Sequence, residues 1–219
     1  YDVRFVYVRE KEAYLSLREK RDVIEWQLDE VLDINGWDLR KALVQFHKGN
    51  AVIFEWANSP VVYKTTKEWE EIYECCGQYF SEKAALYHYY GTANSTYRQY
   101  LQGSEVRYKK YIYALRPLLA CRYVEHNHAV PPVRFEELLK QELPGELTDK
   151  IGEMLAKKAE SDERDMNPRI PVIQRFIEDE IARYGQISKE MAEDRNPGWE
   201  ALDGIFLRMV GVDGIGDIK

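Results

Sequence analysis

The sequence lacks the signatures of several enzyme classes and of membrane proteins. It contains no Gly-x-Gly-x-x-Gly fingerprint, no P-loop lysine, no nucleophile elbow and no Cys-x-x-Cys pair. These absences argue against a dehydrogenase, a P-loop kinase, a lipase and a redox protein. No apolar run approaches the roughly 20 residues that a membrane-spanning helix requires, so we expect no membrane partner.

Cysteine is also scarce. The three cysteines are Cys75, Cys76 and Cys121, and an odd count with an adjacent pair is not typical of a disulfide framework. His126 and His128 follow Cys121, but without a second cysteine pair their spacing predicts no zinc site. No signal peptide is visible in the printed residues. We expect reduced thiols and a cytoplasmic protein.

Positive charge does not dominate the composition. The chain has 31 Lys and Arg against 38 Asp and Glu, which gives a formal net charge of −7. An acidic balance does not attract nucleic acid to the whole surface. Any polynucleotide contact therefore requires a local basic patch.

Hydrophobic patterns along the chain predict an α+β fold. Residues 1–9, residues 22–28 and the stretch around Asp33 are apolar and β-branched, as strands are. Helical periodicity begins at Asp38, where Leu39, Leu43 and Phe46 share a face. The expected helices cover residues 38–47, 67–79, 81–102, 104–127, 134–141, 146–160 and 169–192.

This segregation of strands and helices predicts three parts. A small mixed sheet occupies residues 1–66, a helical domain occupies 67–195, and a Gly/Asp-rich tail occupies 196–219. Within the tail, residues 199–210 are apolar enough to form a short helix that docks on the body or on a partner.

Asp2 and Asp33 are the first candidate functional residues. Each belongs to a short strand-like stretch, and two carboxylates at the ends of adjacent strands commonly hold a divalent metal beside a phosphate. The alternative is an ordinary strand-end salt bridge with Arg4 or Arg40.

The segment Asn35-Gly36-Trp37-Asp38 has two interpretations. In the first, Gly36 permits a tight strand-to-helix turn and Asp38 caps the helix that follows. In the second, the turn contacts a nucleotide.

The expected helix over residues 104–127 is basic. Lys110 lies on one helical stripe, and Lys109 and Arg116 lie on another. The predicted buried side consists of Leu115, Leu118, Leu119 and Val124. Taken alone, the charges are also consistent with a solvated face.

Six separated blocks carry a resemblance to a known family. They are Tyr1-Asp2-Val3-Arg4-Phe5, residues 32–43, residues 54–60, Tyr87-His88-Tyr89, residues 107–120 and residues 168–172. In order and spacing, over roughly residues 1–184, they resemble a family of predicted nucleotidyltransferases in the DNA polymerase β superfamily. Some members of that family accompany RNA-repair genes.

The resemblance implies an activity and its ligands. A nucleoside monophosphate is transferred from a nucleoside triphosphate to a hydroxyl, possibly on RNA, with Mg²⁺ or Mn²⁺. Asp2 matches the second and Asp33 the third of three metal-binding catalytic acids. Lys110 and Arg116, with Lys109 next, match the position of cations that hold the β- and γ-phosphates.

The resemblance also implies a Gly-Ser loop and a first aspartate immediately before the position of Tyr1. Because the printed sequence starts at Tyr1, we expect the chain as printed to be catalytically inactive.

Two other classes of function stay open. The first is a non-catalytic nucleotide or RNA sensor on the same scaffold, which binds without turnover. The second is a helical interaction protein. This second alternative is favoured if Asp2 and Asp33 face away from each other across the sheet.

Overall fold

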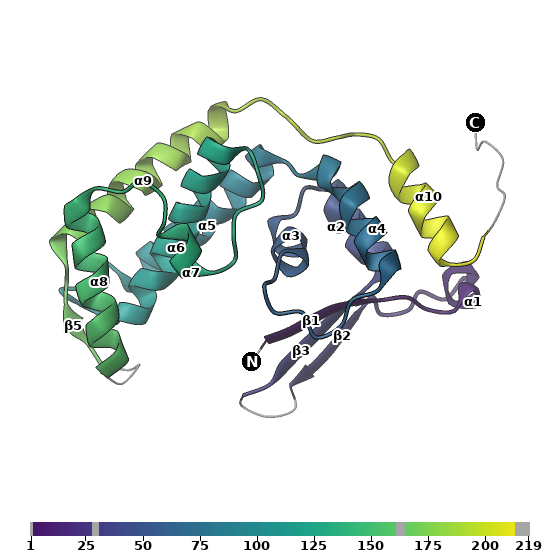
Figure 1. Cartoon of the computed structure of the whole chain (residues 1–219), viewed down its shortest axis with the longest axis horizontal. Helices are drawn as coiled ribbons and strands as arrows, with labels where there is room; N and C mark the ends of the chain where they lie inside the picture. The colour runs from purple at the N-terminus through teal and green to yellow at the C-terminus, as the bar shows by residue number, and fades with distance from the viewer. Residues whose placement is uncertain (1, 28–30, 161–164, 213–219) are drawn as a thin grey trace. The chain divides into compact units, whose positions relative to one another are not determined.

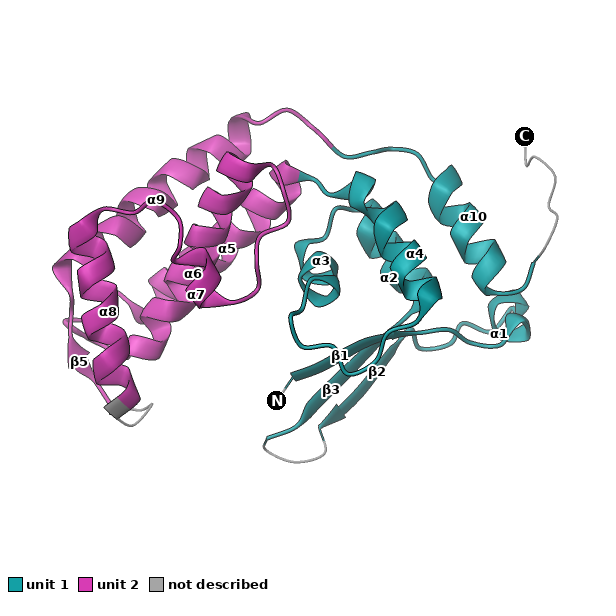
Figure 2. Cartoon of the chain, viewed as in Figure 1, with its two compact units in different colours: residues 1–81, 195–219 teal, residues 82–194 magenta. Residues whose placement is uncertain are grey.

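The computed structural model describes residues 2–27, 31–160 and 165–212, and the chain divides into two compact units (Figure 2). Unit 1 comprises Tyr1–Ser81 and Arg195–Lys219, and unit 2 comprises Glu82–Asp194. The predicted division at residue 66 differs from the boundary at Ser81, whereas the predicted division at residue 195 lies within one residue of the boundary at Asp194. The helix that begins at Lys67 belongs to unit 1, because it packs against other helices of that unit.

Unit 1 consists of a small sheet and the helices that follow it (Figure 1). Its elements are β1 (Asp2–Tyr7), α1 (Lys11–Leu15), β2 (Val23–Gln27), β3 (Asp33–Asp38), α2 (Leu39–His47), α3 (Ala51–Ala57), α4 (Lys67–Cys76), the 3-10 helix η1 (Gly77–Tyr79) and α10 (Glu200–Met209).

The sheet is mixed, with the strand order β1-β3-β2. β1 runs parallel to β3, from the pair Asp2 and Asp33 to the pair Tyr7 and Asp38, whereas β2 runs antiparallel to β3. Helices α2, α3 and α4 lie on one side of this sheet in Figure 1. The predicted α+β class is confirmed, since a small mixed sheet at the N-terminal end is followed by helices.

Gly36 is a strand residue, so the predicted tight turn at this position is wrong. It pairs with Phe5 between β1 and β3, and the Phe5 ring lies directly over it. A Cβ atom at residue 36 would come within 2.2 Å of Phe5 Cζ. The close approach of this ring, and no turn geometry, therefore requires glycine here.

Asp38 ends β3 and caps α2, as the first interpretation of this segment predicts. Its Oδ1 accepts a hydrogen bond from the backbone N–H of Arg40 at 2.9 Å. Its Oδ2 accepts one from the Tyr14 hydroxyl at 3.0 Å and lies 3.3 Å from Arg9 Nε. The side chain is buried, and these three partners compensate for its loss of hydration.

Tyr14 makes unit 1 sensitive to alkaline pH. Burial, with a further contribution from Asp38, raises the pKa of Tyr14 from its ordinary 10.0 to about 12. Because the pKa is higher in the folded state, the stability that Tyr14 contributes is present below pH 10 and is lost as the pH rises through about 12. We expect the difference in unfolding free energy between the parent and Tyr14→Phe to shrink over that interval.

Denaturant unfolding followed by tryptophan fluorescence measures this difference. All five tryptophans lie in unit 1, so the signal reports on the unit that contains Tyr14. A difference that stays constant from about pH 9 to about pH 12 contradicts the prediction.

The core of unit 1 lies among its helices. Leu39, Leu43 and Phe46 are buried on α2, which confirms the predicted helical face. Phe46 meets Phe54 of α3 edge to face, with ring centroids 5.0 Å apart. Aromatic pairs of this kind add about 0.5–1.5 kcal/mol beyond the area that they bury.

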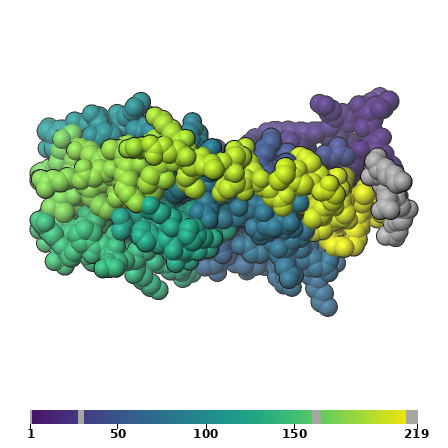
Figure 3. All heavy atoms as spheres, turned by 90° about the horizontal axis from the view of Figure 1, so that it is seen from above, coloured from purple at the N-terminus to yellow at the C-terminus, as the bar shows by residue number. Residues whose placement is uncertain are grey.

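The helix expected at residues 199–210 is α10, and it docks on unit 1. It packs against α2 and α4, and its yellow spheres lie against the blue ones of the α2–α4 segment in Figure 3. Phe206 contacts the Tyr14 ring edge to face at 5.1 Å, and Trp199 stacks on His47 at 3.5 Å.

Unit 2 is mostly helical and is organised around a pair of long helices, α5 and α6. Its elements are α5 (Glu82–Tyr100), β4 (Glu105–Val106), α6 (Tyr108–Asn127), α7 (Phe135–Leu138), α8 (Gly145–Glu160), β5 (Asn167–Pro168) and α9 (Pro171–Glu190). α6 packs along α5, and α9 packs against both. The predicted buried side of α6 is confirmed, since Leu115, Leu118, Leu119 and Val124 have no exposed surface.

The two short strands of unit 2 differ from the predicted all-helical pattern. β4 pairs antiparallel with β5, so Val106 lies opposite Asn167. The helix expected from residue 104 consequently begins only at Tyr108. Pairing between segments so far apart in sequence leaves no local signal, which is why the prediction missed it.

None of the helices in the described ranges combines the length and the apolar character that crossing a bilayer demands.

Candidate active site

Asp2 and Asp33 lie side by side on the sheet. They are direct register partners at the starts of the parallel strands β1 and β3, and paired residues of neighbouring strands share a face. The condition that would favour a helical interaction protein, two acids facing apart across the sheet, is therefore not met.

Arg4 joins the two carboxylates. Because it follows Asp2 by two residues on the same strand, its side chain projects from the same face. Its Nη2 donates to Asp2 Oδ1 at 2.9 Å and to Asp33 Oδ2 at 2.8 Å, and its Nη1 donates to the Asp33 carbonyl oxygen at 3.2 Å. The strand-end salt bridge with Arg4, left open by the sequence, is thus present.

These ion pairs are weak enough to be exchanged. The side chains of Asp2 and Asp33 are 75% and 53% exposed, and that of Arg4 is 25% exposed. Exposed ion pairs typically contribute about 0–1 kcal/mol. A stronger cation can therefore compete with Arg4 for the same two carboxylates at little cost to folding.

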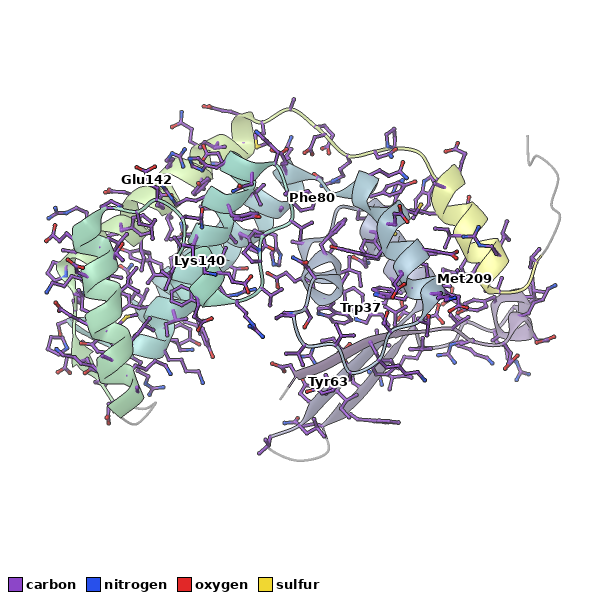
Figure 4. The ribbon with its side chains drawn as sticks, in the orientation of Figure 1. Trp37, Tyr63, Phe80, Lys140, Glu142 and Met209 are labelled. Carbon is purple, nitrogen blue, oxygen red and sulfur yellow. The ribbon has the colours of Figure 1, made fainter. Side chains whose placement is uncertain are left out.

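The same face of the sheet continues toward the helices. Asn35 pairs with Arg4 in the next row, and its Oδ1 is buried without a hydrogen-bond partner among the described residues. Trp37 follows and packs on Trp56 of α3 at 4.2 Å, and Figure 4 shows it between the sheet and the helices. The Arg4 guanidinium lies 6.0 Å from the Trp56 ring centroid.

The donor chemistry fits Mg²⁺ or Mn²⁺. Both ions prefer carboxylate oxygens, and Mg²⁺ is commonly held by only one or two carboxylates together with substrate phosphates. Asp2 and Asp33 supply two such groups that already converge on one cationic centre. Within the described ranges no cluster of three or more His, Cys, Asp or Glu side chains is suited to hold a metal, so this donor set has two members.

The candidate phosphate ligands belong to unit 2, on α6. Lys110 Nζ lies 3.8 Å from the ring centroid of Tyr100 and 5.1 Å from that of Tyr113. Lys109 Nζ lies 5.8 Å from the Tyr113 ring. Both tyrosines are exposed, so these lysines belong to an accessible surface of cations and aromatic rings.

Arg116 differs from the two lysines. Its Nε donates to the carbonyl oxygen of Val133 at 3.1 Å, and the side chain is half-buried. It therefore fastens the segment after α6 to the helix. Its role as a phosphate ligand stays a prediction.

The sequence analysis assigns no functional role to Trp56 or Tyr100, and it includes Asn35 only as part of a segment that could contact a nucleotide. The alternation of strand side chains could have placed Asn35 on the face of Asp33, two residues earlier. No comparable signal exists for Trp56 or Tyr100, because their neighbours come from other elements of the fold.

A mixed sheet with paired aspartates, followed along the chain by helices, is what the resemblance to a polymerase β-type nucleotidyltransferase implies. Residues 1–208 match the model of a family described as "RlaP: RNA repair pathway DNA polymerase beta family". The chain belongs to this family, which confirms the resemblance and supports a nucleotidyltransferase-type function.

One curated protein is similar over almost the whole chain. It is named "Uncharacterized protein YcgL", comes from Bacillus subtilis (strain 168), and is 39% identical over 212 residues. The similarity covers 96% of this chain and 82% of the relative. No solved structure matches the chain.

Proposed function

We propose that this chain, completed by the Gly-Ser loop and first aspartate that the resemblance implies, transfers a nucleoside monophosphate from a nucleoside triphosphate to a hydroxyl group of an RNA acceptor, with Mg²⁺ or Mn²⁺ held by Asp2 and Asp33. The observation that carries the proposal is the register pairing of these two aspartates on one face of the sheet. Membership of an RNA-repair polymerase β family supports the class of reaction.

The proposed reaction is an in-line displacement. The acceptor oxygen bonds to the α-phosphorus, the bond from this phosphorus to the oxygen that bridges to the β-phosphorus breaks, and pyrophosphate leaves with the electron pair. The hydroxyl proton passes to solvent. A bound divalent cation supplies neutralisation of the phosphate charge and a lower pKa of the attacking hydroxyl.

Three residues of unit 1 prepare this site. Asp2 and Asp33 provide hard oxygen donors, and Arg4 holds both carboxylates on one centre before a ligand arrives. Because the Arg4 contacts are largely exposed to water, their replacement requires no rearrangement of the sheet.

Radiolabelled nucleoside triphosphates and a panel of short RNAs test the proposal. The protein should be assayed as printed and in a form that carries the expected Gly-Ser loop and first aspartate ahead of Tyr1. We expect divalent-dependent labelling of RNA in the second form. Binding of nucleotide without labelling of RNA, small molecules or protein would instead favour the sensor.

Lys110 provides a test of phosphate binding. We expect Lys110→Ala to weaken binding of a nucleoside triphosphate by about 1.5–3 kcal/mol, the usual contribution of one charge-assisted contact. The loss should be smaller for the monophosphate, which lacks the β- and γ-phosphates, and binding of the divalent cation should change less. Isothermal titration calorimetry measures all three affinities.

Lys140 supplies the matched control, because it is an exposed lysine of the same unit (Figure 4). Lys140→Ala should leave the triphosphate affinity within about twofold of the parent, as expected for a solvated charge. Equal losses for monophosphate and triphosphate in Lys110→Ala would show that Lys110 does not contact the β- and γ-phosphates.

A further inference from the structure

Unit 2 contains a pocket that is separate from the residues considered so far. Its volume is about 270 Å³, and it is lined by the start of α6, one side of α8 and the junction between β5 and α9. All of these elements belong to unit 2, so the pocket is complete within one compact unit.

The lining of this pocket is positively charged. Lys150, Lys157 and Arg169 contribute three cations, and Glu153 contributes one anion. Glu153 is paired with Lys150 at 2.8 Å, so it offsets one cation and leaves two. No ion pair or hydrogen bond engages Lys157 in the described part of the chain. In a chain of net charge −7, such a local excess of positive charge favours an anionic ligand.

Arg169 has donor capacity left over. Its Nη2 donates to the main-chain carbonyl oxygens of Leu101 and Gln102, at 3.1 and 2.6 Å. Its Nε is buried and has no acceptor among the described residues. Carbonyl oxygens fix the side chain but do not neutralise its charge. Glu178 lies near enough for its carboxylate to interact with this charge. Because Nε is closed to solvent, an oxyanion in the pocket would be attracted by the charge of the guanidinium and would not reach Nε.

The N-terminus of α9 adds to this field. Ile170 and Pro171 line the pocket, Ile170 is the N-cap, and no side chain caps the helix. Pro171 has no N–H, and the N–H of Ile170 donates to the Tyr111 hydroxyl at 3.2 Å, so Val172 and Ile173 have the first N–H groups without intrahelical acceptors. The dipole of this 20-residue helix places partial positive charge at the same end. Phosphate groups commonly bind at such helix ends.

The rest of the lining is apolar. Tyr108, Met154 and Ile170 form this wall, and Tyr108 is almost completely buried. A volume of about 270 Å³ exceeds the need of a lone phosphate and leaves room for the sugar or base attached to it. The combination of a cationic end with an apolar wall is suited to a nucleotide.

We propose that this pocket binds a phosphate-bearing terminal nucleotide of the RNA acceptor, with Lys157 and Arg169 as its phosphate ligands. The inference rests on the proposed function, to which it adds a recognition site for the acceptor. The shared chemistry is a nucleotide phosphate monoester, and its source can be a strand end or a free mononucleotide.

Fluorescence anisotropy distinguishes these sources. The probe is an oligoribonucleotide of about ten nucleotides, with and without a terminal 5′-phosphate or 3′-phosphate, bound to the full chain without divalent cation. We expect at least one phosphorylated end to bind about tenfold more tightly than the hydroxyl form. Competition by AMP and by inorganic phosphate at similar concentrations would identify the free mononucleotide or phosphate as the ligand, and would overturn the strand-end assignment.

Variants place the interaction in the pocket. Lys157→Gln should weaken binding of the phosphorylated strand about tenfold and reduce its salt dependence by about 0.7 on the log–log slope. Lys158→Gln, one residue further along α8 and outside the pocket lining, should change binding less than twofold. Arg169→Gln should have the largest effect, and Arg169→Lys should retain part of the affinity.

The outcomes separate this inference from the proposed function. If Lys157→Gln and Lys158→Gln lose equal affinity, or if neither differs from the parent, the pocket is not the site. Arg169→Gln is interpreted only when its thermal midpoint matches the parent, and Lys157→Gln decides otherwise. Pocket-dependent binding without any nucleotidyl transfer supports the pocket and contradicts the transferase proposal.

Discussion

Asp33→Asn should reduce nucleotidyl transfer by roughly 100-fold or more while the fold is retained. The amide has the size of the carboxylate but no charge, so it is a poor ligand for Mg²⁺ and a poor partner for Arg4. A loss of this size corresponds to about 2.7 kcal/mol of transition-state stabilisation. Asp33 is largely exposed, so the unfolding free energy should change by less than about 1 kcal/mol.

The rates of the parent and of Asp33→Asn are compared in the form that carries the expected residues ahead of Tyr1. Binding of Mn²⁺ to the printed chain provides a second measurement, which does not depend on turnover.

Glu25→Gln is the matched control. Glu25 lies on β2 in register with Asn35, on the same face of the sheet, but it pairs with Arg21. Its rate should stay within about threefold of the parent, as expected for a solvated pair. An Asp33→Asn variant with more than about a tenth of the parent rate would show that Asp33 is not a metal ligand.

The acid pair shows how far one sequence determines a site. Strand alternation places Arg4 on the face of Asp2 without further information. Which strand lies beside β1 does not follow from this alternation. β2 comes between β1 and β3 in the sequence, but in the sheet it lies at the edge and β3 pairs directly with β1. That order follows from packing of the whole unit. The strand-like patterns therefore make Asp2 and Asp33 candidates, and the family resemblance is what favours their lying on neighbouring strands.

Helical periodicity was the most reliable signal. The apolar stripe of α6 identified Leu115, Leu118, Leu119 and Val124, all fully buried, because a helix that packs on another must present such a stripe. The stripes of charged residues on α6 are less informative. The sequence does not show that Lys110 lies over the Tyr100 ring or that Arg116 donates a hydrogen bond to the Val133 carbonyl oxygen, because both partners come from other segments of the chain.

Glycine and short strands gave the errors. The pattern predicts a turn at Gly36, whereas in the structure Gly36 lies within β3, where any larger residue would require the Phe5 ring to move. Glycine marks both a turn and a close contact, and only the folded neighbour distinguishes them. The ladder of β4 with β5 involves two residues in each strand, too few to produce a periodic pattern.

Asp38→Ala should lower the unfolding free energy of unit 1 by about 2–4 kcal/mol. The substitution removes the N-cap of α2, which alone typically contributes about 1 kcal/mol. It also leaves the Tyr14 hydroxyl and the Arg9 guanidinium without the acceptor that the Asp38 carboxylate, only 6% exposed, provides. For a chain of this size, the thermal midpoint should fall by roughly 5–15 °C.

Asp38→Asn separates the cap from the charge. Asparagine is as good an N-cap as aspartate, so the bond from the Arg40 N–H should survive. Its amide nitrogen, however, replaces the oxygen that faces Arg9 Nε, and two donors then oppose each other. We expect a loss of about 1–2 kcal/mol, between the parent and the alanine variant.

Tryptophan fluorescence measures both variants, because all five tryptophans report on unit 1. Asp22→Ala is the control, since Asp22 forms an exposed ion pair with Lys41 that should contribute less than about 1 kcal/mol. The measurement also decides what the segment around Asp38 does. If Asp38→Ala unfolds like the parent but no longer binds nucleotide, Asp38 serves the ligand. If stability falls in the order parent, asparagine, alanine, its carboxylate acts by joining α2 to the sheet and to α1.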